Sequence, residues 1–320
     1  MGQEYIKRGN EKFNLGDFKG AIYDYDIAIE LNPDIPDAYI DRGLAKYELR
    51  DYRGAIRDYC IAIELNPNDA DIYIDRGLAK SELGDFAGAI SDYGKAIALN
   101  PGCAEAYINR GSTKSEIRDY RGAIEDFSKA IEINPDYAET YYNRGNAKFD
   151  IRDYSGAIDD FSEAVGLKPG FADAYINRGV AKSKFKNNSG AEADYTKAIE
   201  INPGHALAYY NRGISRYFLK KYGDSINDFS KAIELKPDHL EAYVNRAASK
   251  YYFRNYEGAI SDYNEAIEID NHYAKAYANR GIIKIITGNN INDGCKDLEK
   301  AIKLGETSEL IKEYLIKYKK

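Results

Sequence analysis

Histidine and cysteine, the residues that most often serve as nucleophiles, bases and metal ligands, are few and widely separated in this sequence. The histidines are His205, His239 and His272, and the cysteines are Cys60, Cys103 and Cys295. Neither set shows the short spacings of a metal site. We therefore expect no metal, no cofactor and no catalytic activity, and we interpret the cysteines as small apolar residues in a reducing compartment.

Opposite charges, by contrast, recur at a fixed spacing. Arg42 and Lys46 stand four residues apart, so both lie on one face of a helix. If an antiparallel helical hairpin turns near residue 50, Asp58 lies level with Arg42. The same arrangement pairs Arg110 with Asp126 and Arg178 with Asp194. We expect a ladder of these ion pairs, within a hairpin or between neighbours. Because it recurs everywhere, we interpret it as structural, and a binding role is the alternative.

These charges belong to a repeat of 34 residues. Proline recurs with this period at Pro33, Pro67, Pro101, Pro135, Pro169, Pro203 and Pro237. The period divides the chain into nine units: 2–35, 36–69, 70–103, 104–137, 138–171, 172–205, 206–239, 240–273 and 274–308. Stacked repeats build a core that grows lengthwise. The sequence thus predicts one solenoid domain over residues 2–305.

Each unit predicts two helices, as the second unit shows. Tyr39, Gly43 and Tyr47 fall near helical spacing, and Arg50-Asp51-Tyr52 is a polar turn. A second helix then carries small or apolar residues on one stripe: Ala55, Ile56, Tyr59, Ala62, Ile63 and Leu65. It ends at Asn66-Pro67, because the residue before a proline is pushed out of the helical region. Gly43 and Ala55 flank the turn, where we expect the two backbones to approach closely.

The unit resembles the tetratricopeptide repeat, with Tyr39, Gly43, Ala55, Tyr59, Ala62 and Pro67 in the relative places of that motif. The resemblance covers residues 2–305. It implies an all-α, right-handed superhelical solenoid of helical hairpins, in which each first helix lines a concave groove. It also implies a non-catalytic scaffold or adaptor that binds a peptide or a partner helix in this groove.

The two ends of the chain differ from the interior units. The first unit has Glu4 and Glu11 where interior units have small residues such as Ala38 and Ala45. This polarity is typical of a terminal repeat. At the other end, residues 308–320 predict a capping helix with Leu310, Ile311, Tyr314, Leu315 and Tyr318 on one side. We expect this helix to cover the last hairpin, so that the array begins and ends within this sequence.

A row of amides and acids precedes the repeated arginines: Asp41, Asp75, Asn109, Asn143, Asn177, Asn211, Asn245 and Asn279. The six asparagines resemble the asparagine ladder of the O-linked N-acetylglucosamine transferase repeats. An amide can pair with both the N–H and the C=O of a bound peptide, whatever its sequence. The alternative, equally weighted, is that the amide satisfies a local helix end.

A second row changes character along the chain. It is acidic in the early units, at Glu48, Glu82 and Glu116, and becomes aromatic later, at Tyr252 beside Tyr210, Tyr217 and Tyr251. We expect these residues to face the groove. They favour a protein or peptide partner with a basic segment and an adjoining apolar anchor. A solvated acidic face is the alternative.

Charge and hydropathy narrow the remaining classes of partner. Residues 1–170 have a charge balance of −11 and residues 171–320 one of +4. An acidic chain is a poor nucleic-acid binder, and no apolar run reaches the roughly 20 residues needed to span a bilayer. Without a signal peptide, we expect a cytoplasmic protein, although a chain that had lost its signal would look the same. The charge asymmetry leaves an alternative function, a homo-oligomer that associates through its acidic and basic halves.

Overall fold

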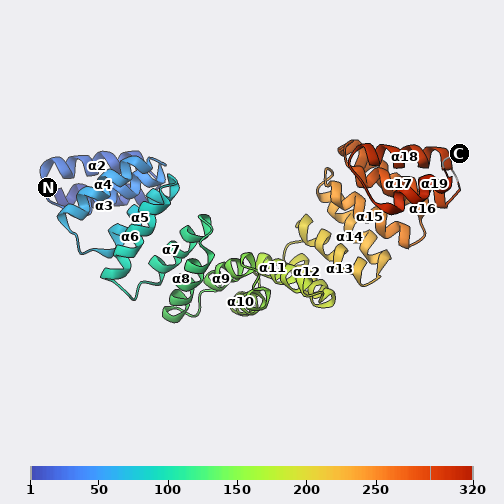
Figure 1. Cartoon of the computed structure of the whole chain (residues 1–320). Coiled ribbons are helices and arrows are strands. Elements are labelled where there is room, and N and C mark those ends of the chain that lie inside the picture. Colours follow the sequence, from blue (N-terminus) through green and yellow to red (C-terminus); the bar gives the residue numbers. More distant parts are fainter. Residues whose placement is uncertain (1, 289, 319–320) are drawn as a thin grey trace. The chain divides into compact units, whose positions relative to one another are not determined.

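The computed structural model describes residues 2–288 and 290–318, and in these residues it contains nineteen helices and no strand (Figure 1). The helices are α1 (Gly2–Asn14), α2 (Phe18–Leu31), α3 (Pro36–Glu48), α4 (Tyr52–Leu65), α5 (Ala70–Glu82), α6 (Phe86–Leu99), α7 (Ala104–Glu116), α8 (Tyr120–Ile133), α9 (Ala138–Asp150), α10 (Tyr154–Leu167), α11 (Ala172–Lys184), α12 (Asn188–Ile201), α13 (Ala206–Phe218), α14 (Tyr222–Leu235), α15 (Leu240–Tyr252), α16 (Tyr256–Ile269), α17 (Ala274–Ile286), α18 (Ile291–Lys303) and α19 (Glu309–Tyr318). The first eighteen form tandem hairpins, so the fold is an all-α solenoid of the expected kind.

The turn inside each hairpin is set by a short run of residues. In the second hairpin, Arg50 adopts the left-handed conformation with φ of 62°. Asp51 then caps α4, because its side chain accepts a hydrogen bond from the Gly54 N–H at 2.9 Å. The expected turn extended to Tyr52, but Tyr52 is already the first residue of α4. The helix begins at this residue because the side chain of Asp51 accepts a hydrogen bond from a backbone N–H that has no partner within the helix.

Small residues allow the helices to pack closely. Ala38, Ala55 and Ala62 are completely buried. Gly43 makes a close approach, but its neighbour is the ring of Tyr59 and not Ala55 as the sequence suggested. A Cβ on Gly43 would lie 2.6 Å from that ring. The two differ because a tyrosine side chain on the facing helix extends across the hairpin, so the nearest neighbour of the glycine is not the residue at the same height.

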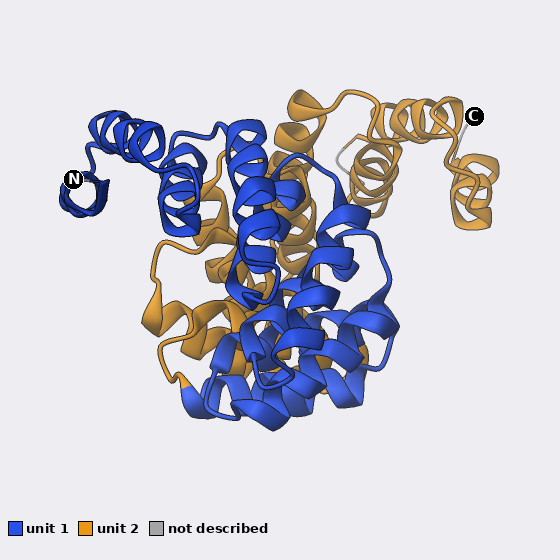
Figure 2. Ribbon diagram, turned by 90° about the vertical axis from the view of Figure 1, so that its left-hand side faces the viewer, with its two compact units in different colours: residues 1–167 blue, residues 168–320 orange. Residues whose placement is uncertain are grey.

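The chain forms two compact units, residues 1–167 (unit 1) and 168–320 (unit 2), which Figure 2 colours separately. In unit 1, each first helix contacts the next, as α1 with α3 and α3 with α5. In unit 2, α11 contacts α13 and α13 contacts α15. Each unit therefore presents a face built from first helices, which we call the first-helix face. A single domain over residues 2–305 stays a prediction.

The C-terminal helix α19 packs against α17 and α18 through Ile311, which is 2% exposed. Leu310, expected on the packed side, is instead 48% exposed. Two residues of the predicted capping segment 308–320, Lys319 and Lys320, lie outside the described residues. Of the helices in the described ranges, none is long and apolar enough to cross a membrane.

Candidate polypeptide-binding face

The repeated cations of the first helices are bound inside the scaffold. Arg42 donates two hydrogen bonds to the carboxylate of Asp58, from Nε at 3.0 Å and from Nη2 at 2.7 Å. Lys46 Nζ lies 2.6 Å from the same carboxylate. Asp58 is only 2% exposed. One buried aspartate of the second helix thus holds two cations of the first helix, and we call this group a triad.

A triad occurs in every hairpin. The nine groups are Arg8–Lys12–Asp24, Arg42–Lys46–Asp58, Arg76–Lys80–Asp92, Arg110–Lys114–Asp126, Arg144–Lys148–Asp160, Arg178–Lys182–Asp194, Arg212–Arg216–Asp228, Arg246–Lys250–Asp262 and Arg280–Lys284–Asp297. All of these pairs form within one hairpin.

Because the triads contain part of the charge of each unit, the net charge of the residues outside the triads differs from the net charge of the whole unit. Unit 1 contains 20 Lys and Arg against 32 Asp and Glu, a balance of −12. Its five triads hold ten of the cations and five aspartates, so the residues outside the triads carry −17. Unit 2 has a balance of +5, and its four triads account for +4 of it. The net charge outside the triads is therefore strongly negative in unit 1 and close to zero in unit 2.

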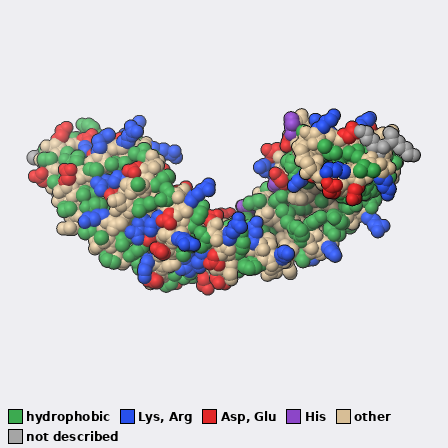
Figure 3. Space-filling model, in the orientation of Figure 1, with side chains coloured by type: hydrophobic (Ala, Val, Ile, Leu, Met, Phe, Trp, Pro, Cys, Tyr) green, Lys and Arg blue, Asp and Glu red, His purple; other side chains and the backbone are tan. Residues whose placement is uncertain are grey.

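In the view of Figure 3, charged and apolar side chains are interspersed over the visible face.

The predicted acidic row lies at the ends of the first helices of unit 1. Glu48, Glu82 and Glu116 are the last residues of α3, α5 and α7, and all three are exposed. None of the three forms an ion pair with any residue that the structure describes. Two of them act together at Tyr47, whose pKa is raised chiefly by burial and then by nearby groups that include Glu82 and Glu48. Glu48 and Glu82 thus act on the same neighbourhood, and Glu116 ends the next first helix along the chain.

Asp41 and Asp75 occupy the amide row but are less exposed than the acids at the helix ends. Burial raises the pKa of Asp41 to about 6, opposed by a hydrogen bond from Asn10 and assisted by Asp37. Burial raises the pKa of Asp75 to about 7, assisted by neighbouring carboxylates that include Asp71. No cation within the described ranges pairs with either group. Both are therefore ionised only at a cost near neutral pH.

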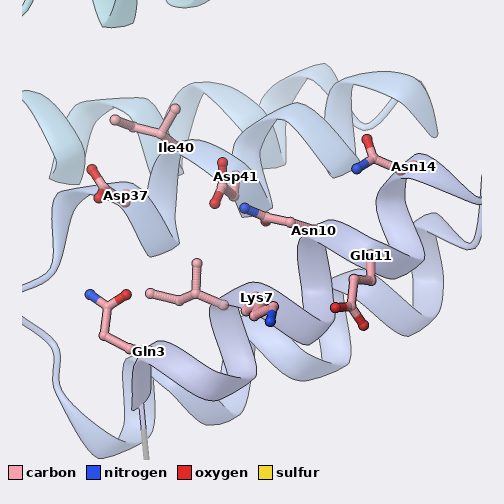
Figure 4. Close-up of a pocket in the computed structure, with 9 residues that line it drawn as sticks. Gln3, Lys7, Asn10, Glu11, Asn14, Asp37, Ile40 and Asp41 are labelled. Carbon is pink, nitrogen blue, oxygen red and sulfur yellow. The ribbon is translucent and has the colours of Figure 1, made fainter.

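Asp41 lines an open pocket of about 550 Å³ between α1 and α3. Figure 4 shows Asp41 and Asn10 pointing toward one another across it. With its amide nitrogen directed at the acid, Asn10 donates to Asp41 Oδ2 at 3.0 Å. Lys7, Glu11 and Asp37 also line this pocket. Its lining is thus polar, with more carboxylates than cations.

Five of the six asparagines of the row fall into two groups. Asn245 donates to the Tyr210 hydroxyl at 3.0 Å, and Asn279 is hydrogen-bonded to Tyr263, so these two amides bind neighbouring tyrosines. Asn109, Asn143 and Asn211 make no side-chain hydrogen bond within residues 2–288 and 290–318. Asn143 lines a pocket of about 220 Å³ between α7 and α9, together with Glu116 and Asp150. The structure therefore brings a predicted amide and the predicted acid Glu116 to one pocket, where Asp150 adds a second carboxylate.

The tyrosines predicted for the later units form a cluster in unit 2. The ring centroid of Tyr252 lies 5.8 Å from Tyr217 and 5.1 Å from Tyr251, with both pairs nearly perpendicular. Tyr222 stacks on Tyr252 at 5.3 Å. Tyr252 is 53% exposed. Tyr210 lies apart from this cluster, against His239.

Sequence comparisons identify the family. Models described as tetratricopeptide repeat match residues 40–102, 142–206 and 206–239, and one described as TPR repeat matches residues 9–50 and 119–151. The chain belongs to the tetratricopeptide repeat family. Proteins of this family are generally non-catalytic interaction scaffolds. A comparison with curated proteins found no match.

Several solved tetratricopeptide repeat structures are similar to parts of the chain. One, a crystal structure of the protein MamA, is 31% identical, with a TM-score of 0.51 over 54% of this chain and 94% of the other. YrrB, described as a TPR protein with an unusual peptide-binding site, is 26% identical, with a TM-score of 0.53 over 57% and 95%. A tetratricopeptide repeat protein from Parabacteroides merdae is 20% identical, with a TM-score of 0.55 over 78% and 99%, and supports the fold alone.

Two features of this tetratricopeptide repeat protein escaped the sequence analysis. Asn10, which binds Asp41, occupies a position where the next unit has Leu44, so the repeat gave no signal for it. Leu310 of α19 lines a pocket beside Tyr251 although it lies outside the repeats. Its signal would have been its place at the start of the capping helix, one residue from the buried Ile311.

Proposed function

We propose that this protein is a non-catalytic adaptor whose first-helix face binds an extended peptide or partner helix, and that the face in unit 1 takes a basic segment. The proposal rests on one observation, that the cations of the first helices α3 to α9 of unit 1 are already bound within the scaffold. Every Lys and Arg of α3, α5, α7 and α9 belongs to a triad, each bound to a buried aspartate. The exposed acids of those helices are thus left to a partner.

Charge complementarity supports a basic partner for two reasons. Carboxylates grouped on one face raise the local concentration of cationic ligands and their association rate. The half-buried Asp41 and Asp75 lack a cation, so a lysine or arginine side chain placed beside them would offset the cost of ionising them. An unsatisfied charge on a recognition face is a specific reason to expect an oppositely charged ligand.

The amides suit the main chain of the same partner. Asn109 and Asn143 offer both a donor and an acceptor on the successive first helices α7 and α9 of unit 1, and Asn211 offers the same groups on α13 of unit 2. These groups fit peptide N–H and C=O groups. The 26% identity with YrrB, a TPR protein with an unusual peptide-binding site, supports peptide binding in general. Asn245 and Asn279 already bind tyrosines, so we assign them to the scaffold.

The basic partner is tested by calorimetry with a synthetic lysine-rich peptide. A triple variant with Glu48→Gln, Glu82→Gln and Glu116→Gln should bind it at least tenfold more weakly. The matched control changes three exposed glutamates of second helices, Glu30→Gln, Glu64→Gln and Glu163→Gln, with the same loss of charge. Equal weakening by both variants, or affinity that is unaffected by salt, would contradict a specific acidic site.

The amide role and the self-association alternative have separate tests. Replacing Asn143, Asn177 and Asn211 together should reduce capture of bound polypeptides, and retention of every partner would remove the amide hypothesis.

Light scattering at rising salt tests whether the acidic half of one molecule associates with the basic half of another. A concentration-dependent dimer that salt dissolves would favour that alternative. Because unit 2 carries only +1 outside its triads, we expect a monomer instead.

A further inference from the structure

We propose that a pocket in unit 2 between α13, α15, α17 and α19 is an anchor site for one large apolar side chain, leucine or phenylalanine, of the bound polypeptide. This inference rests on the proposed function, since it names a second recognition element on the first-helix face. It adds a specificity-determining role for the C-terminal helix, which packing alone would assign only to covering the last hairpin.

The pocket measures about 290 Å³ and is lined by residues from five helices: the first helices α13, α15 and α17, the second helix α16, which contributes Tyr263, and the capping helix α19. Tyr217 comes from α13 and Tyr251 and Tyr252 from α15, while Ile282 comes from α17 and Leu310 from α19. Pockets lined by aromatic and aliphatic groups are the usual sites for hot-spot side chains. Its volume suits a single large side chain and not a folded element.

The absence of charge in the lining selects the occupant. Within the part of the chain that the structure describes, the residues that line this pocket are all uncharged, whereas the pocket between α1 and α3 contains Lys7, Glu11 and two aspartates. The groups that raise the pKa of Tyr217, after burial, are the other tyrosines Tyr252 and Tyr222. A lysine or arginine of the partner would lose its hydration here without gaining a carboxylate, so an apolar side chain fits better.

The C-terminal helix contributes through two consecutive residues that point differently. Ile311 is 2% exposed and fixes α19 against the last hairpin, whereas Leu310 lines the pocket and remains 48% exposed. The exposed Leu310 and the exposed Tyr252 become buried when a ligand fills the pocket that they line, and this burial favours binding. Leu310 is therefore suited to contact the ligand without being needed for the fold.

The test uses N-acetyl-leucinamide and N-acetyl-phenylalaninamide as probes, with N-acetyl-lysinamide as the charged control. In protein labelled at the isoleucine methyl groups, nuclear magnetic resonance titration should shift Ile282 and Ile283 with the apolar probes and not with the lysine probe. Leu310→Asn should weaken apolar binding roughly fivefold, the effect expected from removing one partly buried wall. Ile316→Asn, on the same helix but 84% exposed and outside the pocket, is the matched control.

Saturating shifts of Ile282 and Ile283 that are lost in Leu310→Asn and kept in Ile316→Asn would support the anchor site. Shifts spread over all isoleucines, equal response to the lysine probe, or full binding by Leu310→Asn would overturn it. None of these results depends on the carboxylates of unit 1. The anchor site and the basic-segment site can therefore fail separately, because the glutamate variants test only the latter.

Discussion

Asparagine in place of Asp75 should stabilise the protein in a pH-dependent manner. Asp75 is largely buried without a cation, and its pKa is raised to about 7 from an ordinary value of 3.8. In six other hairpins the chain places asparagine at this position, from Asn109 to Asn279. The Asp75→Asn variant therefore keeps the shape and hydrogen-bonding capacity that the fold accepts elsewhere, and it removes only the ionisation.

The magnitude follows from linkage between protonation and folding. One pKa unit corresponds to about 1.4 kcal/mol, so a rise of about three units makes ionised Asp75 cost up to about 4 kcal/mol. Because the folded state holds the proton more tightly than the unfolded chain, wild-type stability falls as pH rises from about 4 to about 7. The variant has no such loss. Its advantage should be near zero at pH 4 and should level off above pH 7, at about 2–4 kcal/mol.

The measurement is urea unfolding followed by circular dichroism at pH 4, 5, 6, 7 and 8. Transition midpoints are compared, because stacked repeats need not unfold in two states. Glu82→Gln, which removes an exposed carboxylate from the same helix that does not act on the pKa of Asp75, is the matched control and should show no comparable pH dependence. An advantage of Asp75→Asn that is equal at pH 4 and pH 8, or none at pH 8, would refute the reasoning.

Three further outcomes are expected. Asp126→Ala should lower stability by roughly 3–5 kcal/mol in thermal unfolding, because Arg110 and Lys114 lose their buried partner; unchanged stability would remove the structural role of the triads. Arg118→Gly should raise stability by roughly 0.5 kcal/mol, since φ is 62° there and Gly84 serves the same turn; a lower urea midpoint would contradict this. Binding of a lysine-rich peptide at pH 6.5 should release protons, measured by calorimetry in two buffers, and the release should be absent in the combined Asp41→Asn and Asp75→Asn variant.

Much of the fold follows from the 34-residue period, because each unit repeats the same small residues, cap and helix end. The pairing of Asp58 with Arg42 could also be predicted from residue spacing, because an antiparallel hairpin with a known turn fixes which residues face each other. The sequence does not show that Gly43 opposes the Tyr59 ring, because side-chain reach is not part of a spacing argument.

The candidate site is less predictable, for a physical reason. A stripe of helix positions is visible in the sequence, but burial at each position depends on the neighbouring hairpin. Asp75 and Glu82 lie on the same helix and both look like groove acids, yet one is largely buried with a raised pKa and the other is exposed. The position of Leu310 beside the tyrosines is harder still to predict, because it lies on α19, a helix outside the repeats.

The triads explain how one scaffold can present first-helix faces of such different chemistry. Their aspartates fix two cations of every first helix, so the charge needed for packing is separated from the charge available to a ligand. The face of unit 1 can then become acidic and that of unit 2 aromatic without changing the hairpins. Asparagine suits the position of Asp41 and Asp75 in six other hairpins, so the scaffold itself does not require an acid there. Retaining an aspartate that is costly to ionise is best explained by a cationic group of the partner that offsets this cost on binding.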